Sequence, residues 1–226
     1  MTGIPIADRP TLLRHGRIDL ALWTLRSGEG RPLLLLHGLG EHTVPIEPEW
    51  TATWPGPVYG LDFTGHGAST LPRGGGYTAE MLMADADAAL AHLGEASLVG
   101  RGLGAYIALM LAGSRPAQVY GAVLCDGPGL SGGGVQPGGT FVTVPRFGHG
   151  TTPDPFAMVE LNRDIRPPDY AAQFVRLGFE RSPVPDPLLV AAIVRPEWLA
   201  TVVAQPGVRT MHRDRALAEL ARTVSG

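Results

Sequence analysis

The stretch from Ser97 to Tyr106 constrains the fold of this chain more than any other. Its sequence, SLVGRGLGAY, places three glycines between a short apolar run and a second apolar segment. A short apolar run bounded by glycine is typical of a buried strand, and the following segment is expected to continue as a helix. The glycines at positions 100, 102 and 104 predict a tight turn, because glycine enters backbone conformations that other residues avoid. The stretch therefore indicates an α/β protein.

The glycine turn matches a known motif in all but one residue. In a Gly-x-Ser-x-Gly nucleophile elbow, a strained strand-to-helix turn holds a serine above the sheet. Gly100 and Gly104 stand where the flanking glycines belong, whereas Gly102 stands at the serine position and has no side chain. A plain turn before a helix, or half of a phosphate-binding turn, would explain the same glycines. The motif alone does not decide between these interpretations.

Two upstream segments have the same form, a strand that runs into a glycine-containing loop. PLLLLHGLG at 32–40 has a continuous apolar run, which suits a central parallel strand buried on both faces. VYGLDFTGHGAS at 58–69 is a second short strand, and Asp62 is expected to accept backbone N–H groups in its loop. With the turn at Gly102, this order resembles the α/β-hydrolase superfamily over residues 18–126. The resemblance implies a mostly parallel sheet with helices on both faces.

Composition narrows the possible partners. A net charge of -3 argues against nucleic acid, because proteins that bind it normally present a basic face. The single cysteine, Cys125, excludes an internal disulfide and is compatible with a cytoplasmic location. No run approaches the roughly 20 apolar residues that span a bilayer, so no membrane partner is expected. His66 has no second ligand at a helpful spacing, and no metal or cofactor is expected.

The first half of the chain is expected to contain further regular elements. Apolar spacing predicts a helix over 78–93 that ends at Gly94, with Asp85 and Asp87 on its solvated side. The alternating run 18–26 is expected to be an edge strand, and a buried strand is expected at 121–126.

The second half is expected to be organised differently. Residues 154–203 carry many prolines and are predicted to form short helical pieces. A last short strand at 208–211 and a closing helix at 215–224 are expected to follow. We expect one domain over 1–226, in which residues 127–204 form a reduced cap or a small helical lid.

The resemblance also implies places for a catalytic acid and base. The superfamily histidine lies between the last strand and the closing helix, where His212 stands, and its reference pKa of about 6.5 suits a general base. Asp126, at the end of a predicted strand, is the first candidate for the acid that orients His212. The alternatives are an exposed histidine at a helix start and an aspartate that caps a turn. Asp154, before Pro155, is expected to cap a helix.

The segment HGLG at 37–40 resembles the turn that forms an oxyanion hole. The resemblance implies one backbone N–H donor at Leu39 and a second at Leu103, the residue after the nucleophile position. Backbone donors do not depend on side-chain identity, so this hole is expected to survive the loss of a serine. His37, Gly38 and His149 are expected to border the pocket, and the side chain of His37 is expected to be structural rather than catalytic.

Three functional hypotheses remain open at this point. The pocket could serve an enzyme without a covalent intermediate, in which His212 activates water or removes a proton next to a carbonyl. The protein could instead be non-catalytic, binding a small apolar or ester-like molecule in the pocket or a partner on its surface. Finally, Gly102 could stand where a serine was replaced by engineering. The sequence does not choose among them, although Gly102 excludes covalent serine catalysis as the chain is written.

Overall fold

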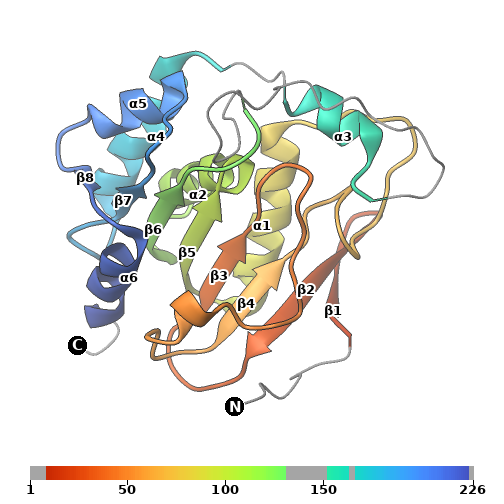
Figure 1. Ribbon diagram of the computed structural model, residues 1–226, viewed down its shortest axis with the longest axis horizontal. Coiled ribbons are helices and arrows are strands. Elements are labelled where there is room, and N and C mark those ends of the chain that lie inside the picture. Colours follow the sequence, from red (N-terminus) through yellow and green to blue (C-terminus); the bar gives the residue numbers. More distant parts are fainter. Residues whose placement is uncertain (1–8, 131–151, 163–165, 224–226) are drawn as a thin grey trace.

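The computed structural model describes residues 9–130, 152–162 and 166–223, which form an eight-stranded sheet (Figure 1). The strand order is β1-β2-β4-β3-β5-β6-β7-β8. Only the β1–β2 and β2–β4 pairings are antiparallel within this described sheet. The mostly parallel sheet confirms the predicted fold class. The strands are β1 (Thr11–His15), β2 (Ile18–Arg26), β3 (Leu33–Leu36), β4 (Val58–Leu61), β5 (Ala96–Arg101), β6 (Val119–Cys125), β7 (Leu188–Ala191) and β8 (Arg209–Thr210).

Helices cover both faces of the sheet. Figure 1 shows α1 and α2 behind the sheet and α6 in front of it. The larger core lies on the α1 and α2 side, and the smaller core lies under α6. No helix in the described ranges is long and apolar enough to cross a bilayer. The helices are α1 (Ala79–Leu93), α2 (Leu103–Ser114), α3 (Pro155–Glu160), α4 (Pro168–Arg181), α5 (Glu197–Val203) and α6 (Arg213–Arg222).

The helix α1 confirms the predicted boundaries and corrects one expectation about its faces. Thr78 caps its start by accepting the N–H of Met81, and Gly94 ends it at a φ of +83°. Asp85 is 1% exposed, and its carboxylate accepts the N–H of Thr64 at 2.9 Å. The prediction that Asp85 lies on the solvated side is therefore wrong. Its position three residues after buried Leu82 places it on the same helix face.

Two strands also differ from the sequence-based expectations. The strand at 18–26 has the predicted bounds, but it does not form the edge, because β1 pairs with its outer side. The strand β7 lies between β6 and β8, in a region where only short helical pieces were predicted. Four apolar residues, LLVA, form this strand and supply its hydrogen-bonding register with Ala122 to Cys125.

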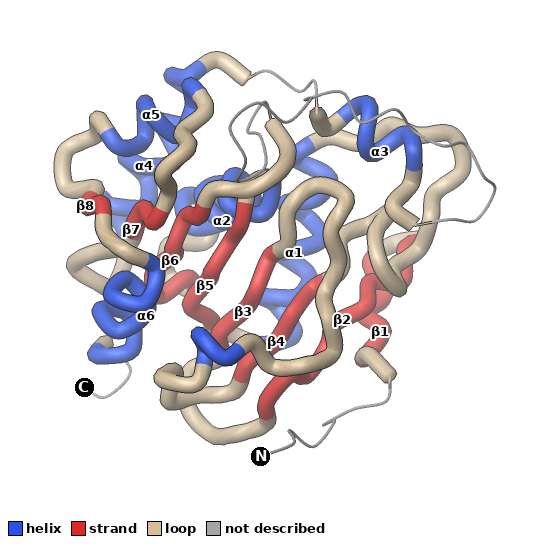
Figure 2. The backbone as a smooth tube through the Cα atoms, viewed as in Figure 1, coloured by secondary structure: helices blue, strands red, loops and turns tan. Residues whose placement is uncertain are grey.

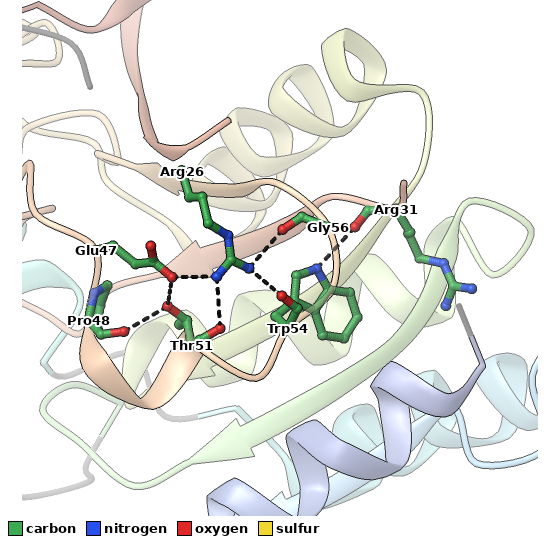
Figure 3. A network of polar contacts seen from close by, with 7 residues as sticks. All are labelled: Arg26, Arg31, Glu47, Pro48, Thr51, Trp54 and Gly56. Carbon is green, nitrogen blue, oxygen red and sulfur yellow. Dashed lines mark hydrogen bonds and ion pairs between the residues drawn. The ribbon is translucent and has the colours of Figure 1, made fainter. Parts of the chain in front are cut away.

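The connection from β3 to β4 contains only the short 3-10 helix η1 (Glu49–Thr51), as Figure 2 shows. Arg26 at the end of β2 fixes this connection (Figure 3). Its guanidinium donates to Glu47 Oε1 at 2.7 Å and to the carbonyl oxygens of Trp54 and Gly56. Several hydrogen bonds to one planar group hold the loop in a defined position, so the residues of η1 form a fixed wall in front of the sheet.

Candidate functional site

Gly102 connects β5 directly to α2. Its φ of +55° and ψ of −115° belong to a region that residues with side chains rarely occupy. Its N–H donates to the carbonyl oxygen of Cys125 at 3.0 Å, and its own carbonyl oxygen accepts the N–H of Ala105 at 3.0 Å. The tight turn predicted for these glycines is confirmed, and its conformation at Gly102 is one that favours glycine.

The loop that follows β6 folds back toward this turn, and Pro128 in that loop accepts two backbone hydrogen bonds. The carbonyl oxygen of Pro128 accepts the N–H of Leu39 at 3.0 Å and the N–H of Leu103 at 2.9 Å. These are the two backbone donors that the sequence singled out, and both of them bind the same oxygen. The oxygen that they bind belongs to the chain itself.

The packing around Pro128 depends on small residues. A Cβ atom built on Gly38 would lie 2.8 Å from the Pro128 ring, and one built on Gly102 would lie 2.2 Å from the Pro128 carbonyl oxygen. A Cβ atom built on Gly129, which has a φ of +105°, would lie 2.8 Å from the Cβ atom of Leu39. Because atoms of real side chains do not come this near to a backbone oxygen, the loop holds this position only against glycine.

His37 lies beside this contact and is held in one protonation state. Its Nε2 accepts the N–H of Phe63 at 3.1 Å, so the proton of the neutral ring is on Nδ1, which donates to the carbonyl oxygen of Gly38 at 2.8 Å. Burial, and secondarily the neighbouring His66, lower the pKa of His37 to about 3. A neutral ring with both nitrogens engaged supports the structural role expected for His37.

Hydrogen bonds to the side chain of Asp62 hold the loop after β4. The carboxylate of Asp62 accepts the N–H groups of Thr43 at 2.7 Å and Ala68 at 2.9 Å, which confirms the expectation for this residue. The buried ring of His66 lies 5.1 Å from the ring of His37, and burial lowers its pKa. Asp154 caps α3 through the N–H of Phe156, as predicted from the sequence.

A cavity of about 660 Å³ opens beside this turn, at the carboxyl ends of β5, β6, β7 and β8. Its walls combine apolar side chains with charged ones. The apolar residues include Trp50, Val99, Cys125, Val190 and Met211, and the charged or titratable ones are Arg101, Asp126, Arg195, His212 and Arg213. Ligands of open α/β sheets commonly bind at this edge, so the cavity is a candidate ligand site.

Asp126 and His212 both line this cavity, but they do not form the hydrogen bond that was expected between them. The Oδ2 atom of Asp126 accepts the N–H groups of Ile193 at 3.0 Å and Val194 at 3.1 Å. The side chain of His212 is 78% exposed, and its Nδ1 lies 3.6 Å from Asp214 Oδ2. Within the described residues His212 makes no hydrogen bond to Asp126, so the predicted pairing is wrong. Asp126 is engaged by the turn after β7, and Asp214 is nearer in sequence to His212.

Glu41, which sequence reasoning missed, pairs with Arg101 and accepts the N–H of Gly38 at 3.0 Å. Its position directly after the HGLG segment was the only available signal. His149, expected at the pocket, lies outside the described residues. Nowhere in the described ranges do three His, Cys, Asp or Glu side chains gather as a metal site would require.

Comparison with known proteins agrees with this architecture. The family model described as the alpha/beta hydrolase family matches residues 33–225. The chain therefore belongs to the α/β-hydrolase family. No curated protein sequence matches it.

Solved structures show the same fold over most of the chain. The thioesterase domain from the curacin biosynthetic pathway is 18% identical, with a TM-score of 0.57 over 96% of this chain and 99% of that one. The monoacylglycerol lipase of Paleococcus ferrophilus is 20% identical, with a TM-score of 0.56 over 91% of this chain and 99% of the lipase. At these identities the likeness concerns the fold alone.

Matches of higher identity are partial. An N-acyl homoserine lactone degrading enzyme is 26% identical, but the alignment covers 50% of this chain and 44% of that enzyme. The TM-score of this alignment is 0.42. The chain thus aligns with less than half the length of such relatives.

Proposed function

We propose that this chain is a non-catalytic member of the family that binds a small molecule. Gly102 takes the position of the nucleophile. It ends β5, begins α2, has a positive φ, and is followed by Leu103, one of two convergent N–H donors. A serine at this place would attack the substrate carbonyl, whereas glycine offers no group for covalent catalysis.

The observation that carries the proposal is the double hydrogen bond to the carbonyl oxygen of Pro128. In an active hydrolase, the N–H groups of the oxyanion hole bind the oxygen of the substrate as charge develops on it. Here an oxygen of the chain satisfies both donors at 2.9 and 3.0 Å. A substrate would have to displace the loop and break both bonds, each worth about 1 kcal/mol.

The positions of the candidate acid and base also favour binding over catalysis. A general base must lie within hydrogen-bond reach of the proton that it removes. His212 is largely exposed and lies near Asp214, while Asp126 holds the backbone of the turn after β7. The two side chains therefore do not form the pair that the enzyme hypothesis needs.

The close packing at Gly102 bears on the hypothesis of an engineered replacement. A serine Cβ would lie 2.2 Å from the carbonyl oxygen of Pro128, in a loop that also packs against Gly38. The loop and the glycine fit each other, which supports glycine as the residue for which this site is shaped.

With catalysis disfavoured, small-molecule binding is the function that we assign to the cavity. Its volume of about 660 Å³ lies within the range of roughly 300–1,000 Å³ that is usual for ligand pockets. Its apolar floor and charged rim are also usual for such pockets.

The test combines covalent labelling with ester turnover. The purified protein is incubated with a fluorophosphonate probe and, separately, with p-nitrophenyl butyrate. We expect no adduct by intact-protein mass spectrometry, and a turnover equal to that of His212→Ala and of the surface control His92→Ala. An adduct, or a turnover that His212→Ala abolishes and His92→Ala leaves intact, would contradict the proposal.

A further inference from the structure

We infer that the cavity at the carboxyl ends of β5 to β8 binds an amphipathic monocarboxylate, an anion with a hydrocarbon body. The inference rests on the proposed function, which leaves this cavity for binding. It adds the class of ligand, and two features of the cavity carry it: its charge and its apolar lining.

Positive charge dominates the cavity rim and comes from three separate elements. Arg101 ends β5, Arg195 lies in the turn after β7, and Arg213 begins α6. The one acidic residue of the lining, Asp126, is turned toward backbone N–H groups, which stabilise its carboxylate. Guanidinium groups bind carboxylates through paired hydrogen bonds, so this rim suits an anion.

The ion pairs around the rim indicate how much negative charge the ligand carries. Arg101 forms an ion pair with Glu41, and Arg213 Nε lies 3.4 Å from Asp214 Oδ1. Arg195 makes no ion pair with any residue that the structure describes, and only its Nε is engaged, by a backbone carbonyl. One guanidinium without an acidic partner matches a single negative charge, which favours a monocarboxylate over a doubly charged phosphate.

The interior of the cavity suits a hydrocarbon body. Val99 of β5 and Val190 of β7 line the cavity, and so does Trp50 of η1. The guanidinium of Arg213 lies 4.5 Å from the centre of the Trp50 ring, so the charged rim joins the aromatic wall directly. A ligand with an anionic head and an apolar body would contact both parts at once.

Decanoate is a suitable probe, and methyl decanoate is its uncharged partner. Binding is measured by isothermal titration calorimetry on the full chain, on Arg195→Gln and on Arg181→Gln, which removes an exposed arginine at the end of α4. We expect saturable binding of decanoate, with Kd raised about tenfold or more in Arg195→Gln and unchanged in Arg181→Gln. Methyl decanoate is expected to bind at least about tenfold more weakly, and inorganic phosphate is expected not to compete.

The outcomes separate this inference from the proposed function. Absence of saturable decanoate binding, equal binding of the methyl ester, or equal effects of the two arginine variants would overturn the ligand class alone. Release of decanoate from methyl decanoate, followed by mass spectrometry in the same samples, would instead overturn the proposed lack of catalysis. Unchanged thermal unfolding of Arg195→Gln, an exposed position, shows that its effect on binding does not come from misfolding.

Discussion

The carbonyl oxygen of Pro128 lies 2.2 Å from the point where a Cβ atom on Gly102 would be. The same oxygen accepts the N–H groups of Leu39 and Leu103. One peptide group thus fills the space of a side chain at position 102 and also binds both of these N–H donors. From this relationship we expect that a serine restored at position 102 will not restore a hydrolase.

We predict that Gly102→Ser destabilises the protein. The backbone conformation at this position costs about 1–3 kcal/mol for a residue with a side chain, and displacement of the Pro128 loop adds to it. Chemical denaturation measures the loss. Gly94→Ser is the matched control, since Gly94 also has a positive φ but nothing lies within 4 Å of its Cβ position. If Gly102→Ser loses no more free energy of unfolding than Gly94→Ser, the Pro128 loop moves aside at little cost.

We also predict that Gly102→Ser gains no reactivity toward fluorophosphonates, in contrast to a hydrolase site that lacks only its serine oxygen. A serine would displace the Pro128 loop, but His212 is largely exposed beside Asp214 and is not hydrogen-bonded to Asp126, so no oriented base would activate the new hydroxyl. Labelling is followed by intact-protein mass spectrometry. Labelling of Gly102→Ser that disappears in the double variant with His212→Ala would show that the catalytic groups remain connected.

The sequence predicted the local features of this site better than the long-range ones. The positive φ at Gly102 follows from a glycine turn between a strand and a helix, and the donors at Leu39 and Leu103 follow from the motifs around them. The position of Pro128 was not predictable in this way. It depends on how a glycine-containing loop folds back over two distant turns, for which no local pattern exists.

The remaining errors have physical reasons of the same kind. The charge of Asp85 suggested exposure, but its helical position beside Leu82 places it in the core, where Thr64 supplies a hydrogen bond. The strand β7 has only four residues in a proline-rich region, and its neighbours in the sheet stabilise it. The pairing of His212 with Asp126 failed because the backbone of the turn after β7 competes for the carboxylate.

Asp85 gives a prediction about pH. Burial raises its pKa to about 6 in the folded protein, against 3.8 in the unfolded chain. Between these values the folded state binds more protons, so the contribution of Asp85 to the free energy of unfolding falls as pH rises from 4 to 7. Asp85→Asn removes this dependence and should gain up to about 3 kcal/mol relative to wild type over that range.

The measurement for Asp85 is a series of urea titrations between pH 4 and pH 7. Asp87→Asn, on the same helix but paired with Arg115 at the surface, controls for the introduction of an amide. If the stability difference between Asp85→Asn and wild type is constant with pH, the carboxyl group does not titrate in this range and the account of its burial is wrong.

His37 gives a prediction of opposite sign. Its pKa is about 3 in the folded protein and about 6.5 in the unfolded chain, so the unfolded state binds more protons between these values. The stability that neutral His37 contributes is fully present above pH 6.5 and is lost as pH falls toward 3, by about 1.4 kcal/mol per unit.

Unfolding of His37→Asn should therefore depend less steeply on pH between 6.5 and 4.5 than unfolding of wild type. His92→Asn, which changes an exposed histidine of α1, serves as the control. Equal slopes for His37→Asn and wild type would show that the ring of His37 can be protonated in the folded protein at little cost.

The most direct test of the central claim is detection of the hydrogen bonds to Pro128 by nuclear magnetic resonance. A long-range HNCO experiment reports scalar couplings across hydrogen bonds between an amide nitrogen and the carbonyl carbon of its acceptor. The account predicts correlations from the amides of both Leu39 and Leu103 to the carbonyl carbon of Pro128, together with slow exchange of both amide protons. Absence of these correlations, with both amides exchanging as rapidly as those of exposed loops, would show that the oxyanion hole is open and would contradict the claim.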